Sequence, residues 1–286
     1  MKSLCSLFIL SVALCLCGLN AGAAEPTMKT LLLLGQKPDG HAAGSHEYMP
    51  GQRILQHLLR DVPGWKVEVV QADGPWPEGP ELIAKADAVV LFVSEGGRWV
   101  VEDPRRYDAF AKLAARGGGI SGLHWGVGVK DPKKIAPFVQ LMGACHGGPD
   151  RKFRVIEGEI QVPDSKHPVV RGVAPIKLRD EFYFALKREP KASEALVPLI
   201  TVSIDGVEEM VGWAWQRPDG GRSFGFTGLH FHKSWEKSAY RRLIAQGVLW
   251  TMGQETPAAG IDVKVPTELL VLPKEAEPAK PPAKSK

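Results

Sequence analysis

The sequence predicts an α/β domain with a mostly parallel central sheet that is covered by helices on both faces. Two observations support this prediction. Apolar runs such as TLLLLG at residues 30–35 and ADAVVLFVS at 86–94 are continuous rather than alternating, which is typical of strands buried on both faces of a parallel sheet. Helical stretches separate such runs, and alternating strands and helices imply right-handed crossovers between parallel strands.

The first half of the chain carries this frame. Its predicted elements are a strand at 30–35, a loop rich in Gly, Pro and His at 36–45, an amphipathic helix at 47–60, and strands at 66–71, 86–94 and 119–123. A helix before the last of these strands begins at Asp103-Pro104, a capping residue followed by proline in the first turn. It ends at Arg116-Gly117, where glycine permits the chain to leave the helix.

Beyond residue 152 short apolar runs are separated by Pro and Gly turns, which predicts an antiparallel β decoration in the C-terminal half. These runs lie at 153–162, 181–186, 196–204 and 211–216. The frame resumes with a strand at 223–228 and a helix at about 236–252. Pro, Ala and Lys dominate after Thr256, so we expect residues 257–286 to be disordered.

Residues 1–23 have the layout of a secretory signal peptide. Lys2 supplies a positive charge, residues 7–19 are apolar, and Ala21-Gly22-Ala23 is a small-residue cleavage site. The apolar run is too short for a convincing transmembrane helix. We therefore expect a secreted or periplasmic protein with no stable membrane span after cleavage of the signal.

Two alternatives to a cleaved signal peptide remain open. A lipoprotein is one, although Cys15 and Cys17 each follow leucine rather than the small residue of a lipobox. Translation from Met28, which would give a cytoplasmic protein, is the other. Removal of the leader leaves Cys145 alone, so the mature monomer has no intrachain disulfide and its fold depends on its core.

Composition narrows the class of partner. The chain of 286 residues is 44% hydrophobic, which is sufficient for one large core. Its formal net charge of +4 is not concentrated in a basic stretch, so no nucleic-acid partner is expected. The sequence does not predict an oligomeric state.

Five of the eight histidines fall at the carboxyl ends of predicted strands, where open parallel sheets bind ligands. These five are His41, His46, His124, His230 and His232. His57 lies on a helix and His167 in a turn, so we interpret both as structural or solvated.

His124 occupies the middle of a G-x-H-x-G elbow, in which small flanking residues let a tight turn expose the central side chain. An imidazole there serves as metal ligand or proton-transfer group more often than as nucleophile. If residues 228–232 are extended, His230 and His232 project to the same side and could chelate a divalent ion. The competing interpretation is that each histidine is a buried, hydrogen-bonded structural residue.

Three further segments could contribute to the site. Ser45-His46-Glu47 could add a ligand or base, or be an ordinary helix start. Glu181 and Tyr183, in RDEFYF, could meet a polar ligand or be surface and core residues. Trp99 and Trp125 lie beside polar groups, as suits a sugar ring. We interpret Cys145 as structural and His146 as a possible rim residue.

Four motifs together resemble the ThuA-like (trehalose utilisation) family. They are GSHEY at 44–48, GGGISGLHWG at 117–126, RDEFYF at 179–184 and GLHFHKSW at 228–235, in that order within residues 28–254. The resemblance implies a ThuA-like domain at 24–256. The family lies in the class I glutamine amidotransferase-like superfamily, which implies a flavodoxin-like three-layer α/β/α fold.

Members of that superfamily that hydrolyse glutamine have G-x-C-x-G at the elbow and a later G-x-Q-F-H-P-E. Here His124 replaces the cysteine, His232 matches the catalytic histidine, and Lys233-Ser234 replaces Pro-Glu. The nucleophile and the acid that orients the base are both missing, which excludes glutamine hydrolysis.

The resemblance implies a role in carbohydrate metabolism on a small-molecule sugar, with a link to 3-keto-glucosides and one divalent metal ion as the only expected cofactor. Expected catalytic residues are His124, His232 and Glu181, expected sugar contacts are Trp125, Trp99, Glu47 and Tyr183, and expected metal ligands are His46, His124 and His230. The alternative is a non-catalytic sugar-binding or scaffold module. Redox chemistry is disfavoured because no G-x-G-x-x-G follows the first strand.

Overall fold

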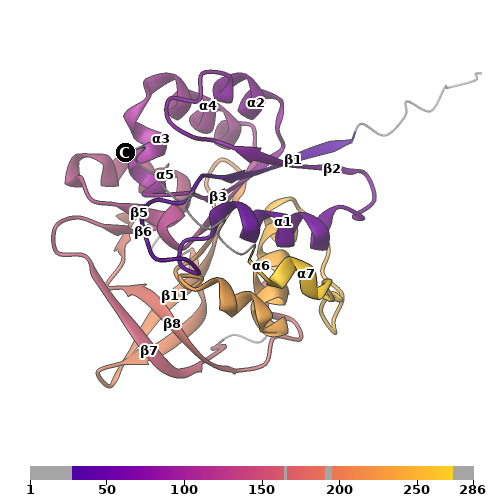
Figure 1. Ribbon diagram of the computed structural model, residues 1–286. Coiled ribbons are helices and arrows are strands. Elements are labelled where there is room, and N and C mark those ends of the chain that lie inside the picture. Colours follow the sequence, from indigo (N-terminus) through magenta and orange to yellow (C-terminus); the bar gives the residue numbers. More distant parts are fainter. Residues whose placement is uncertain (1–27, 164–165, 191–194, 273–286) are drawn as a thin grey trace, which may run out of the picture.

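The computed structural model describes residues 28–163, 166–190 and 195–272, and a seven-stranded sheet lies at its centre (Figure 1). The strands are β1 Lys29–Gly35, β2 Trp65–Gln71, β3 Ala88–Phe92, β4 Gly119–Leu123, β10 Leu196–Ile204, β11 Val207–Gln216 and β12 Arg222–Phe226. Their order across the sheet is β10-β11-β12-β4-β3-β1-β2. All neighbours from β12 to β2 pair in parallel, which confirms the predicted mostly parallel sheet.

The predicted antiparallel decoration is confirmed, and it divides into two parts. Strands β10 and β11 extend the central sheet beyond β12. Strands β7 (Lys152–Ile160) and β8 (Ile176–Phe184) form a separate two-stranded ribbon. The short strands β5 (Gly128–Val129), β6 (Ala144–Gly147) and β9 (Lys187–Arg188) form a small third sheet, and they are too short to show a hydrophobic period in sequence.

Helices cover both faces of the central sheet. They are α1 Tyr48–Leu59, α2 Gly79–Lys85, α3 Gly96–Glu102, α4 Pro104–Ala115, α5 Ile135–Met142, α6 Ser238–Thr251 and α7 Thr267–Leu270. Figure 1 shows α1 and α6 on one face and α2 and α4 on the other. Leu31 and Leu33 pack in the core beneath α1 and α6, and Leu32 packs in the opposite core. The flavodoxin-like three-layer α/β/α class is therefore confirmed.

Side-chain caps and residues of low helix propensity bear on how well each helix could be predicted from the sequence. Asp103 caps α4 by accepting hydrogen bonds from the backbone N–H groups of Arg105 and Arg106, as the sequence predicts. Helices α2 and α3, in regions without a predicted helix, lack such a side-chain cap, as do the predicted α1 and α6, whose hydrophobic period was the signal. Helix α3 also begins with two glycines and α5 contains Pro137, and both residue types argue against a helix in sequence.

The prediction of disorder after Thr256 is wrong for residues 257–272. Helix α7 lies in this segment, and Val263 is 3% exposed. The Val263 carbonyl accepts a hydrogen bond from Arg241, and the Ile261 N–H donates to Gln246. These contacts with α6 hold a segment whose composition alone would not fold. Residues 273–286 and the expected signal peptide lie outside the described residues, within which no helix is long and apolar enough to cross a membrane.

Candidate functional site

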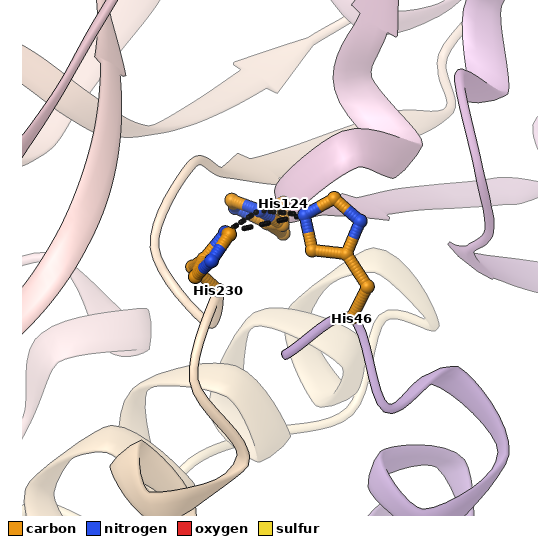
Figure 2. A group of neighbouring side chains, drawn as sticks. All are labelled: His46, His124 and His230. Atoms are coloured by element: carbon orange, nitrogen blue, oxygen red, sulfur yellow. Dashed lines mark hydrogen bonds between the residues drawn. The ribbon is translucent and has the colours of Figure 1, made fainter. Parts of the chain in front are cut away.

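Three histidines from distant parts of the chain converge at the carboxyl ends of the strands (Figure 2). His46 Nε2 lies 3.0 Å from His124 Nε2 and 3.2 Å from His230 Nδ1, and the last two nitrogens are 3.2 Å apart. His124 is fully buried, His46 is 3% exposed, and His230 is half-buried. We call these three residues the histidine cluster.

The elbow after β4 aims His124 into the cluster. His124 itself has a positive φ of 48°, a conformation that is costly for a residue with a Cβ and is often retained at functional sites. The flanking glycines allow close packing, since a Cβ at Gly122 would lie 2.6 Å from Val127 and one at Gly126 would lie 2.3 Å from the Leu91 carbonyl oxygen. The predicted tight turn is confirmed.

Backbone pairing brings His46 and His230 together. The loop after β1 and the segment after β12 form an antiparallel bridge at Ser45 and Phe231. The His46 N–H donates to the His230 carbonyl at 3.0 Å, and the His232 N–H donates to the Gly44 carbonyl at 2.8 Å. Two loops separated by most of the sequence are thereby fixed against one another.

Hydrogen bonds behind the cluster fix the tautomers of two rings. His124 Nδ1 lies 2.8 Å from the Thr227 carbonyl oxygen, and His46 Nδ1 lies 2.9 Å from Asp39 Oδ2. Both oxygens accept, so each Nδ1 carries the proton and each neutral ring presents a lone pair at Nε2. With these tautomers the two Nε2 atoms lie 3.0 Å apart with their lone pairs toward one another, and a cation between them would relieve the repulsion.

Asp39 fixes the orientation of the His46 ring. Its carboxylate accepts hydrogen bonds from His46, from Tyr48 Oη at 2.7 Å and from the exposed His41 at 2.6 Å. Burial raises the pKa of Asp39, but the hydrogen bonds from His46, Tyr48 and His41 outweigh this effect and hold the pKa well below its usual range. A carboxylate behind a ligand histidine is common in metal sites, where it fixes ring orientation and raises basicity.

Burial favours the neutral imidazole in two residues of the cluster, His124 and His46. It lowers the pKa of His124 well below its usual value, and the neighbouring His46 adds to that effect. The pKa of His46 is also lowered by burial, against the opposing effect of the Asp39 hydrogen bond. For His124 and His46 burial therefore favours the neutral imidazole, and it is the neutral ring that coordinates a metal.

Two residues of β8 reach the cluster, as the sequence predicts. Glu181 Oε1 lies 3.4 Å from His230 Nδ1 and 4.0 Å from His124 Nε2. Tyr183 Oη lies 2.9 Å from His124 Nε2, and the two rings stack with centroids 4.6 Å apart. The opposite neighbour of Tyr183 is His146, whose ring stacks on it at 4.0 Å. Burial lowers the pKa of His146 to about 3.

The cluster fits a divalent transition metal. Tetrahedral zinc sites with Zn–N bonds of about 2.0–2.1 Å place their nitrogens about 3.3–3.4 Å apart. The nitrogen separations of 3.0–3.2 Å in the cluster are close to that value. Three imidazoles with a nearby carboxylate also leave a position for a substrate oxygen, which is typical of catalytic rather than structural metal sites.

Residues 39–251 match the ThuA family, whose description is trehalose utilisation. The chain belongs to the ThuA family. No curated protein matches it.

Solved structures similar to this ThuA-family chain share its fold. A ThuA-like protein from Bacteroides uniformis aligns with a TM-score of 0.62 and 14% identity over 83% of this chain and 97% of its own. A glutamine amidotransferase from Thermotoga maritima aligns with a TM-score of 0.40 and 10% identity over 79% of this chain and 96% of its own. The expected ThuA-like membership is shown by the family match, and the first of these two structures shows the shared fold.

Four residues expected in the site of this ThuA-family protein lie elsewhere. His232 does not join the cluster, because β12 ends at Phe226 and Leu229 has a φ of 78°, so the chain turns instead of continuing as a strand. Its ring nitrogens have no hydrogen-bond partner among the described residues. Glu47 accepts from the Gly44 N–H at 2.8 Å and orders the loop. The remaining two are tryptophans.

Both tryptophans are packed rather than available for stacking on a sugar. Trp99 is 5% exposed, stacks on Trp76 at 5.6 Å and lies 4.2 Å from the Arg106 guanidinium. Trp125 is 9% exposed and contacts Tyr183 edge-on, with ring centroids 5.6 Å apart. Trp125 therefore packs edge-on against the ring of Tyr183, and Trp99 packs with Trp76 and Arg106.

Sequence reasoning missed Asp39, Tyr48 and Asp180 as site residues. Asp39 lies two residues before His41 in the loop after the first strand, and this position was the available signal. Asp180 lies within the RDEFYF motif, but the backbone N–H groups and the Ser234 hydroxyl that donate to it come from a distant turn that the sequence does not reveal. The interpretation of Cys145 as structural agrees with its full burial, which raises the pKa of its thiol to about 12.

Asp180 holds the segment that carries His230. Its fully buried carboxylate accepts hydrogen bonds from the N–H groups of Leu229 at 2.8 Å and His230 at 3.1 Å, and from Ser234 Oγ at 3.0 Å. Burial raises the pKa of Asp180 to about 6, despite the opposing effect of these donors. One carboxylate thus gathers several donors that have no other acceptor in the turn.

Asp180→Asn is expected to loosen this segment, because an amide NH2 would face N–H donors where a carboxylate oxygen now accepts. Losing a residue that orients a metal ligand costs about 10- to 100-fold in metal affinity. We expect a loss in this range, measured by competition with a chromophoric chelator. Asp108→Asn, on the exposed face of α4, is the matched control and should retain affinity. Unchanged affinity in Asp180→Asn would remove Asp180 from the site.

Proposed function

We propose that this protein is a metal-assisted enzyme of carbohydrate metabolism that acts on glycosides or keto-sugars such as 3-keto-glucosides. The observation that carries the proposal is the convergence of His46, His124 and His230, whose ligand nitrogens lie 3.0–3.2 Å apart. Membership of a family described as trehalose utilisation supports a carbohydrate as substrate. We further propose, from the leader-like residues 1–23, that the enzyme works in a secreted or periplasmic compartment.

The chemistry of a 3-keto-glucoside matches these residues. A ketone at C3 acidifies the C2 proton, so a base can remove it, a C1–C2 double bond forms and the C1–O bond to the leaving group breaks. A divalent metal supplies stabilisation for the negative charge on the keto oxygen. Glu181 is the carboxylate nearest the cluster and is our candidate for the base. The Tyr183 hydroxyl can donate a hydrogen bond to an oxygen held there.

A binding or scaffold module is the competing function. That alternative would retain the fold while the histidines scatter or are buried singly. Three imidazole nitrogens within 3.2 Å of one another and a carboxylate oxygen 3.4 Å from one of them favour an enzyme. A decayed site has no physical reason to retain Asp39 behind His46.

Metal analysis and turnover test the proposal together. The purified protein is expected to contain about one equivalent of a divalent transition metal, in keeping with a three-histidine site. It should convert a 3-keto-glucoside, a chelator should abolish that turnover, and restoring the metal should recover it. Full turnover by a protein shown to be free of metal would contradict the proposal, and sugar binding without any turnover would support the binding module.

A further inference from the structure

A large groove lies beside the histidine cluster. Its volume is about 1230 Å³, and its lining includes residues 157–159 and 177–179 of the β7–β8 ribbon, the loop at residues 42–45, most of the segment at 231–237, and Leu270 and Leu272. This volume is larger than that of ordinary small-molecule pockets, which is about 300–1,000 Å³. One sugar ring would leave most of it empty.

Strand β8 contributes residues to both the groove and the candidate site, although no residue of the histidine cluster lines the groove itself. Burial alternates along this strand, so Lys177, Arg179 and Glu181 project from the face opposite to the buried Leu178 and Asp180. Lys177 and Arg179 line the groove, and Glu181 belongs to the cluster. Alternate residues of a strand are about 7 Å apart, so the groove begins roughly one sugar unit away from Glu181.

The lining of the groove suits a neutral polyol. Four of its charged residues are basic and three are acidic: Lys177, Arg179, Lys233, Lys237, Glu157, Glu159 and Glu236. None of the seven forms an ion pair with another described residue, although Glu159 accepts a hydrogen bond from Gln161 Nε2 at 3.1 Å. The near balance of charge disfavours a strongly anionic or cationic ligand. Phe231, with the Arg179 guanidinium 4.7 Å from its ring, adds an aromatic surface.

The burial of the cluster limits how much of a substrate can reach it. His124 is fully buried and His46 is 3% exposed, so only the part of a substrate that reaches His230 and Glu181 can enter. The remainder of a glycoside must lie outside the cluster, and the groove is adjacent to Glu181.

We propose that this groove binds the non-reacting sugar units of the substrate, so that the enzyme acts on the end of an oligosaccharide or an extended glycoside. The proposal rests on the function proposed above. It assigns Arg179 to substrate binding, with Phe231 beneath it as a stacking surface.

Calorimetric titration with glucose, maltotriose and cellotriose tests the groove without requiring turnover. We expect one of the trisaccharides to bind at least about 10-fold more tightly than glucose, because its additional sugar units form several further hydrogen bonds in the groove. Arg179→Ala should remove most of this preference. Arg53→Ala, the same change on the exposed face of α1, should retain it.

The same titrations after chelation separate this proposal from the proposed function. Length-dependent binding that persists without metal supports the groove even if turnover of a 3-keto-glucoside is never found. Equal affinity for glucose and both trisaccharides would overturn the groove proposal, as would an undiminished preference in Arg179→Ala. A preference that emerges only in a variant ending at Leu272 would also overturn it, because residues 273–286 would then compete for the groove.

Discussion

His124→Ala is expected to lower the affinity for a divalent metal by at least about 100-fold, since losing a residue that merely orients a ligand already costs about 10- to 100-fold. The substitution removes the nitrogen that lies 3.0 Å from His46 and 3.2 Å from His230. Two of the three imidazole ligands would remain, because Glu181 is the proposed base and not one of the expected metal ligands. Turnover of a 3-keto-glucoside should fall with metal content, measured by elemental analysis and kinetics on the same preparation.

His57→Ala is the matched control for this variant. His57 lies on α1, is half-buried and belongs to no part of the cluster, so metal content and turnover should be unchanged. Thermal unfolding of both variants without metal checks that His124→Ala still folds. A folded His124→Ala protein that retains one equivalent of metal and full turnover would show that the cluster is not the catalytic centre.

Much of the fold could be predicted because local and tertiary preferences agree in the frame. Strand β1 is a continuous apolar run with residues buried on both faces of the sheet, and α4 has a capping aspartate followed by proline. Helix α3 could not be predicted, since Gly96 and Gly97 lower helix propensity. Close packing explains the glycine at position 96. A Cβ at Gly96 would lie 2.2 Å from the Gly126 carbonyl oxygen.

The site was predictable to the extent that topology determines it. His46, His124 and His230 follow three strands whose carboxyl ends meet at one edge, and the sheet-end rule locates all three. His232 was assigned by assuming that the strand continues, whereas the positive φ of Leu229 turns the chain. Asp180 could not be assigned, because its role depends on backbone donors that only the folded turn presents.

The elbow itself provides the second large expected effect. In Gly126→Ala the new Cβ would lie 2.3 Å from the carbonyl oxygen of Leu91, a backbone atom of the central strand β3 that has no rotamer to change. Overpacking a dense core typically costs about 1–3 kcal/mol and occasionally more, and a backbone clash belongs at the upper end of that range. We expect a loss of about 3 kcal/mol in the free energy of unfolding, measured by denaturant titration.

The same clash should weaken metal binding, because the elbow can relieve it only by moving His124 relative to His46 and His230. Gly158→Ala is the matched control, since the nearest atom to its new Cβ is 4.0 Å away and a change of less than about 0.5 kcal/mol is expected. If Gly126→Ala lost both stability and metal affinity while Gly158→Ala lost neither, close packing at the elbow would be the cause of the geometry of His124. If Gly126→Ala were as stable as the control, the elbow would have room to relax, and the glycine would serve no packing purpose.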